Sequence, residues 1–66
     1  MSVAKIIEIS AHSEDSFEDA ARRGIAKASE TVHGIKSAWV EGQQVIVEDG
    51  RVTHFRVAMK VTFVLD

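Results

Sequence analysis

The sequence predicts an α+β fold in the order strand, helix, strand, strand. Three observations lead to it: one amphipathic helical segment, an Asp49-Gly50 turn between two β-rich runs, and unbroken alternation over residues 52–65. Asp-Gly between hydrophobic runs is a strong hairpin signal. A period of two over this length is typical of one long, half-buried strand. We therefore expect a three-stranded antiparallel sheet wrapped on one helix.

The first strand is expected over residues 3–10, with the sequence VAKIIEIS. One face would carry Val3, Ile7 and Ile9, and the other face would carry Ala4, Ile6 and Glu8. Apolar residues on both faces indicate a strand that is covered, at least in part, on both sides.

The helix is expected to begin between Ser13 and Ser16, because either serine can accept a hydrogen bond from a free amide of the first turn. Acidic residues crowd this end, where they suit the positive end of the helix dipole: Glu14, Asp15, Glu18 and Asp19. An apolar stripe follows at helical spacing: Phe17, Ala21, Gly24, Ala28 and Val32. Its small residues indicate very close packing against the sheet. Gly34 is expected as a left-handed C-cap.

Residues 35–48 form the second expected strand, and the alternating run over residues 52–65 forms the third. At roughly 3.3 Å per residue, the third strand would run about 46 Å, which is about twice the length of the helix. A single copy therefore cannot cover its own apolar sheet face. We expect the chain to associate with copies of itself.

Length and composition support one small domain over residues 1–66 that needs extra stabilisation. The absence of cysteine excludes disulfides and thiolate sites. A net charge of −2 with mixed acids and bases gives no basic surface for nucleic acid or for a membrane. There is no signal-peptide pattern and no transmembrane-length apolar run. A soluble cytoplasmic protein is the expectation.

Catalytic motifs are not evident, so we do not expect an enzyme. His12, His33 and His54 fall in three different elements without metal-ligand spacing, which indicates surface or rim histidines. The acidic residues at the start of the helix could hold a hard cation through oxygen ligands. Charges that complement the helix dipole are the simpler interpretation of that cluster.

Two residues in the predicted hairpin are candidates for ligand contact. Trp39 is the sole tryptophan, and it is either a core or interface aromatic or a stacking surface for a planar ligand. Arg56 lies in the middle of a strand, where it is either solvated or a fork for a phosphate or carboxylate. Gln43 and Gln44 offer neutral donors and acceptors nearby.

A family resemblance covers nearly the whole chain. It is carried by the element order, the opening KIIEIS, the segment SEDSFEDAARRGIAKASETV and the close DGRVTHFRVAMKVTFVLD. In these segments the chain resembles the dodecins. The resemblance implies a hollow homododecamer built as four trimers, and many members of that family bind flavins in pairs.

The resemblance departs from the flavin-binding members at two positions. The tryptophan that stacks on the flavin in those members corresponds to Ser37 here, and Trp39 lies two residues later on the same strand face. The glutamine that hydrogen-bonds the flavin corresponds to Arg56. The sequence looks closer to the branch that lacks the tryptophan and carries an arginine, and part of that branch is associated with calcium. Either Trp39 is a shifted stacking surface, or the flavin site is lost.

The resemblance implies a small-ligand binding and storage protein, with flavin (FMN or riboflavin) as the ligand. In that role Trp39 would stack on the ring, Arg56 would neutralise an anionic group and Ser37 would offer a hydroxyl. The alternative is a relative without flavin that binds calcium or another ion, or that serves as a structural shell. Its motivating features are Ser37, Arg56 and the acidic start of the helix.

Overall fold

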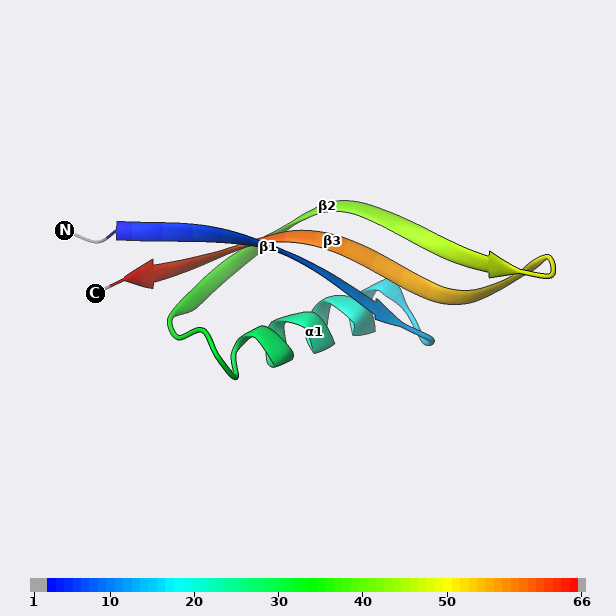
Figure 1. The fold of residues 1–66 in the computed structure, drawn as a ribbon, viewed down its shortest axis with the longest axis horizontal. Helices are drawn as coiled ribbons and strands as arrows, with labels where there is room; N and C mark the ends of the chain where they lie inside the picture. Colours follow the sequence, from blue (N-terminus) through cyan, green and yellow to red (C-terminus); the bar gives the residue numbers. More distant parts are fainter. Residues whose placement is uncertain (1–2, 66) are drawn as a thin grey trace.

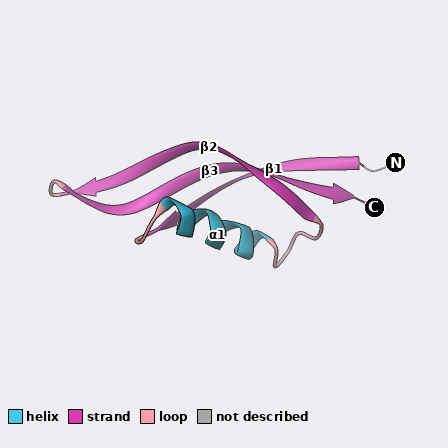
Figure 2. Ribbon diagram, turned by 180° about the vertical axis from the view of Figure 1, so that it is seen from behind, coloured by secondary structure: helices cyan, strands magenta, loops and turns pink. Residues whose placement is uncertain are grey.

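Four elements follow one another along residues 3–65, the part of the chain that the computed structural model describes (Figure 1). They are β1 (Val3–Ser13), α1 (Phe17–Ala28), β2 (Ile35–Glu48) and β3 (Arg51–Leu65). The antiparallel sheet has the order β1-β3-β2, and α1 lies along one side of it (Figure 2). The predicted fold class and element order are confirmed. Residues 1, 2 and 66 of the expected domain lie outside the described part.

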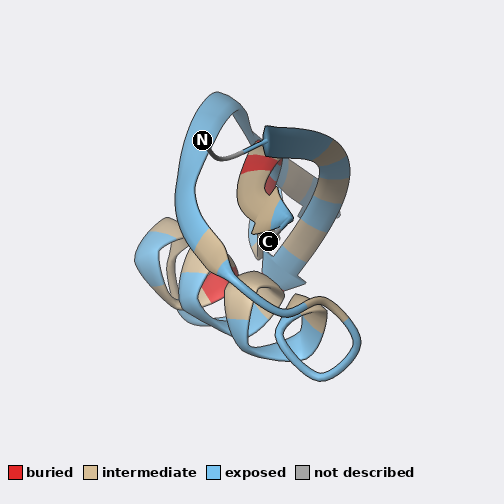
Figure 3. Ribbon diagram, turned by 90° about the vertical axis from the view of Figure 1, so that its left-hand side faces the viewer, coloured by how far each residue is buried: buried red, intermediate tan, exposed pale blue. Residues whose placement is uncertain are grey.

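The central strand β3 divides the sheet into two different faces. Val57, Met59 and Val61 are buried, whereas Arg56 and Ala58, on either side of Val57, are exposed. The three buried residues form the core together with Ala20 of α1. Partly buried side chains surround this core: Ile7, Ile9, Ala11, Phe17, Ala21, Ile25 and Ile35. The predicted alternation is confirmed, and Figure 3 shows that most of the ribbon around the core is exposed.

Strand β1 is three residues longer than predicted and is covered on one side only. Its ladder with β3 continues past Ser10, since His12 pairs with Arg56 and Ser13 pairs with Phe55. The polar residues at this end gave no strand signal, but backbone pairing with β3 continues the strand through them. On the face turned away from α1, Ile6 is 58% exposed. The predicted cover on both sides is therefore not present within one copy.

Helix α1 begins where the serines predicted. Ser16 is the N-cap, and its Oγ accepts a hydrogen bond from the Asp19 amide at 2.9 Å. Ser13 has a different role as the buried last residue of β1. Its hydroxyl donates to Asp19 Oδ2 and accepts from the Asp15 amide at 2.9 Å. The two serines thus fix the turn between β1 and α1.

The helix ends earlier than predicted, at Ala28, with Ser29 as the C-cap. The prediction that the stripe continues to Val32 and that Gly34 caps the helix is wrong. Gly34 has a φ of +78° as it enters β2, and a Cβ there would lie 2.9 Å from the Val64 carbonyl oxygen. The sequence signal for a left-handed glycine was sound, but this backbone turns the chain into a strand.

Close packing of α1 on the sheet is confirmed at Gly24. A Cβ at this position would lie 2.8 Å from Ala11 Cβ and 3.0 Å from Met59 Cε. Glycine therefore lets the helix approach β1 and β3 more closely than any other residue would allow.

Strand β2 receives little cover from the helix, which packs chiefly on β1 and β3. Trp39, Val40, Val45 and Val47 of β2 are all exposed in the single chain. This exposed apolar surface agrees with the expectation that one copy leaves part of its sheet uncovered. Within residues 3–65, no helix is long and apolar enough to cross a membrane.

Candidate functional site

The sheet register places all three candidate ligand residues on one face. Ser37 lies opposite Thr62, and Trp39 lies opposite Lys60. Directly opposed residues of neighbouring strands share a face. Thr62, Lys60 and Arg56 alternate with the buried residues of β3, so they lie on the side turned away from α1. We call this side, which carries Ser37, Trp39, Arg56, Lys60 and Thr62, the open face.

A bulge at Glu41 decides which glutamine joins the open face. The register shifts between Val40 and Gly42, which leaves Glu41 as the extra residue. A bulge of this kind inverts the alternation beyond it. Gln43 therefore lies opposite buried Val57, whereas Gln44 lies opposite Arg56. The structure thus brings only Gln44 of the two onto the open face.

Trp39 presents an open aromatic surface bordered by a row of charges. Its residue is 73% exposed. Its cross-strand partner Lys60 places Nζ 3.6 Å from Glu41 Oε2 and 3.9 Å from Glu8 Oε1. One ammonium thus lies between carboxylates from both flanking strands. A flat ring could stack on this indole with polar groups at its margin.

Arg56 lies on the same face as Trp39 but at a distance from it. Lys60, opposite Trp39, is four residues from Arg56 along β3, which corresponds to roughly 13 Å. Among the residues that the structure describes, Arg56 makes no ion pair and no side-chain hydrogen bond. Its guanidinium is therefore available to a ligand. Within one copy, a ligand that contacts both residues would have to bridge the part of this backbone distance that their side chains leave open.

The three histidines are exposed or half-buried, as predicted, but the fold brings two of them together. The rings of His12 and His54 meet edge to face with centroids 5.7 Å apart. His54 Nε2 lies 3.7 Å from Glu14 Oε1, and its Nδ1 lies 3.0 Å from Thr53 Oγ1. Sequence reasoning missed this pair because the rings become neighbours only through the β1–β3 register. The sequence offered one clue: His54 and Arg56 are two residues apart on the third strand, so they were expected to share a face.

The acidic residues at the start of α1 are engaged within the chain. Asp19 pairs with Arg23 at 2.7 Å, and Glu18 pairs with Arg22 at 3.6 Å. Asp15 lies 4.0 Å from Arg23. Over residues 3–65, no group of three or more His, Cys, Asp or Glu side chains is arranged to hold a metal ion. This arrangement favours the helix-dipole interpretation over a cation site in a single copy.

Comparison with known proteins decides the family. The family model for Dodecin matches residues 3–66, nearly the whole chain. The chain belongs to the dodecin family. Dodecins form homo-oligomers and bind small ligands, and they are known for binding and storage rather than for catalysis. A search among curated proteins found no match.

Solved dodecin structures agree with this assignment over almost their full length. The dodecin from Streptomyces davaonensis is 32% identical, with a TM-score of 0.94 over 98% of this chain and 96% of that one. The dodecin from Streptomyces coelicolor is 28% identical, with a TM-score of 0.94 over 98% and 93% of the two chains. A calcium-chelating antigen from Mycobacterium tuberculosis, described as calcium dodecin with a novel calcium-binding site, is 30% identical. Its TM-score is 0.86 over 97% of this chain and 91% of that one.

Proposed function

We propose that this dodecin is the subunit of a homododecamer that binds and stores flavin, as FMN or riboflavin, on the open face. The observation that carries the proposal is the indole of Trp39, 73% exposed on the same face as Ser37 and Arg56. Trp39 lies two residues after Ser37, the position that corresponds to the usual stacking tryptophan of the family. The face is the same, so a ring stacked on Trp39 would still lie against the open side of the sheet.

Each of the three residues would contribute a different interaction. An indole that stacks on a flat ring gains about 0.5–1.5 kcal/mol beyond the burial of area. Arg56 would pair with an anionic group through its planar fork of donors. Ser37, two residues before Trp39, would supply a hydroxyl to a polar edge of the ring.

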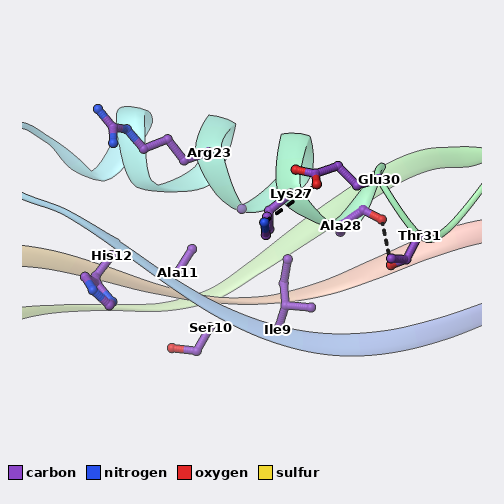
Figure 4. A pocket seen from close by; sticks show the side chains of 10 residues that line it. Ile9, Ser10, Ala11, His12, Arg23, Lys27, Ala28, Glu30 and Thr31 are labelled. Atoms are coloured by element: carbon purple, nitrogen blue, oxygen red, sulfur yellow. Dashed lines mark hydrogen bonds and ion pairs between the residues drawn. The ribbon is translucent and has the colours of Figure 1, made fainter.

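The surfaces that α1 leaves uncovered support the proposed assembly. A groove of about 470 Å³ runs between α1 and β2, where Ile25, Ala38, Val40 and Met59 contribute to its lining. A second pocket, of about 550 Å³, lies on the opposite side of α1 against β1 (Figure 4). A chain of 66 residues buries only about 60% of the surface that its unfolded chain exposes, so a single core is marginal. Further copies of the chain would cover both sides of the helix, and native mass measurement should show twelve subunits.

A flavin titration of the purified, ligand-free assembly tests the binding proposal. The fluorescence of riboflavin and of FMN should be quenched and should saturate at a fixed flavin-to-subunit ratio. Trp39→Ala should weaken the affinity roughly tenfold or more, which corresponds to a loss of about 1.4 kcal/mol. Trp39→Phe, which keeps an aromatic ring, is the matched control and should retain most of the affinity. Unchanged affinity in Trp39→Ala would contradict stacking on this residue.

Calcium is the second candidate ligand. It is favoured by the 30% identity to the calcium dodecin and by the differences from the flavin-binding pattern at Ser37 and Arg56. A ligand that binds only the folded protein raises its melting temperature by mass action. Calcium should therefore raise the melting temperature and a chelator should reverse the change, whereas magnesium serves as the matched ion. A melting temperature that does not respond to calcium would eliminate this candidate.

A further inference from the structure

Arg56 has three polar neighbours on the open face, at the end of the sheet where β1 stops. His12 of β1 and Gln44 of β2 are its direct cross-strand partners. His54 lies two residues earlier on β3, hence on the same face. Arg56 is thus flanked by a donor-bearing side chain on each neighbouring strand and by one along its own strand.

The orientation of His12 is visible beside the helix. Figure 4 shows Ile9 and Ala11 pointing toward α1, whereas Ser10 and His12 point to the opposite side. The His12 ring meets the His54 ring there at 5.7 Å, with an angle of 83° between their planes. Two imidazoles therefore lie together at one corner of the open face, and Arg56 lies directly opposite His12 on that face.

We propose that Arg56, His12 and His54, assisted by Gln44, form a tetrahedral-oxyanion subsite that strengthens when the two histidines are protonated. The subsite rests on the proposed function for its occupant, the phosphate of a phosphorylated ligand whose ring stacks on Trp39. Free inorganic phosphate has the same recognition chemistry. The roughly 13 Å between Trp39 and Arg56 along the strand separates a ring-binding end from an anion-binding end.

The chemistry of the cluster favours an anion between its members. Guanidinium keeps its charge and offers a rigid fork of donors to phosphate oxygens. A protonated imidazole donates from both ring nitrogens, and imidazole is the side chain whose charge changes between about pH 5 and 8. Two protonated rings with centroids 5.7 Å apart would repel each other, and the charge of Arg56 on the same face would add to the repulsion. An oxyanion that contacts all three would offset the repulsion, so binding and protonation favour each other.

Other charged groups near the two histidines affect how strongly an anion would bind there. From the loop after β1, Glu14 approaches His54 Nε2 at 3.7 Å and would compete with the anion. Glu14, Asp15 and Arg23 also line a pocket of about 410 Å³ together with both histidines. Arg23 from α1 is held by Asp19 at 2.7 Å and lies 4.0 Å from Asp15. From β2, the cross-strand partners of Arg56 and His54 are Gln44 and Ile46, which carry no charge.

Sulfate tests the subsite directly, since it remains a dianion over this pH range. The full assembly, labelled at its histidine rings, would be titrated with sodium sulfate at constant ionic strength at pH 5.5 and pH 8. We expect saturable shifts of the His12 and His54 signals at pH 5.5, and affinity at least about fivefold weaker at pH 8. His33, in the loop before β2, is the internal control and should not shift. The absence of saturation, equal shifts at His33, or equal affinity at the two pH values would overturn the proposal.

Single substitutions measure how much each residue contributes to sulfate binding. Arg56→Gln should abolish sulfate binding at pH 5.5, and His12→Gln or His54→Gln should each weaken it by about threefold or more. Glu14→Gln should strengthen binding, because it removes the competing carboxylate. His33→Gln should leave affinity unchanged. If His12→Gln and His54→Gln have no more effect than His33→Gln, the histidines are not part of the subsite.

A comparison of FMN with riboflavin at one pH separates this inference from the flavin proposal. If both flavins bind, His12→Gln and His54→Gln should weaken the affinity for FMN but leave the affinity for riboflavin unchanged. Should the two variants leave FMN affinity unchanged, the subsite is overturned while flavin storage stands. If neither flavin binds but sulfate shows the expected pattern, the subsite binds a free oxyanion and the flavin proposal fails.

Discussion

The two faces of β3 carry opposite properties within one strand. Val57, Met59 and Val61 are at most 2% exposed and form the core with α1. Arg56 and Ala58, on either side of Val57, are exposed, and Lys60 forms ion pairs with Glu8 of β1 and Glu41 of β2. The period of two thus places one set of residues in the core and leaves the other set exposed on the open face, where we propose ligand binding. Substitutions on the two faces should therefore have separable effects on stability and on binding.

Met59→Ala tests the inner face and should have the largest effect. Truncation of a buried methionine costs about 2–5 kcal/mol of unfolding free energy, through lost burial and a residual cavity. Lys60→Ala, one residue away on the open face, is the matched control. Its ion pairs are partly exposed and should be worth at most about 1 kcal/mol. Chemical denaturation at one fixed protein concentration would measure both, and similar losses would remove the distinction between the faces.

Gly24→Val should have the second largest effect, because even a Cβ at this position would lie 2.8 Å from Ala11 Cβ. Overpacking of this kind costs about 1–3 kcal/mol as helix and sheet move apart. Gly42 on β2 is the control, since a Cβ there would meet nothing within 4 Å. Gly42→Ala should change stability by no more than about 0.5 kcal/mol. A stable Gly24→Val protein would show that the contact between α1 and the sheet tolerates expansion.

Ser13→Ala should have a smaller effect on stability, and it extends the comparison of the two faces to β1. Its buried hydroxyl joins Asp19 Oδ2 to the Asp15 amide, and loss of such a bond costs about 1 kcal/mol. Ser10→Ala removes an exposed hydroxyl from the open side of the same strand and should be nearly neutral. Thermal melts of the two variants side by side would measure the difference. Equal melting temperatures would mean that the Ser13 hydroxyl contributes no net stability.

Local patterns were sufficient to predict the architecture. The alternation over residues 52–65, the Asp49-Gly50 turn and the Ser16 cap each depend on neighbouring residues, and each is found in the structure. The two incorrect boundaries depend on distant residues. β1 continues to Ser13 because β3 pairs with it, and the backbone around Gly34 is fixed by the approach of Val64. Local sequence propensity cannot reveal those contacts, because they join residues that are far apart along the chain.

The candidate site was less accessible to prediction for the same reason. The sequence proposed Trp39, Ser37 and Arg56 for ligand binding, and the register places them on one face. Their function in binding stays a prediction. Two features required the fold itself: the bulge at Glu41, which turns Gln44 rather than Gln43 toward Arg56, and the meeting of His12 with His54.

The pairing of the first strand with the last has a consequence for synthesis on the ribosome. Val3 lies opposite Leu65, so β1 finds its neighbour in the sheet only when β3 has emerged (Figure 1). The β2–β3 hairpin is local and can close first, whereas β1 must wait through the translation of the other three elements. Long-range pairing of this kind slows folding. Until then Ile7 and Ile9 lack the core that β3 provides, and nascent chains emerging side by side could capture one another's first strand.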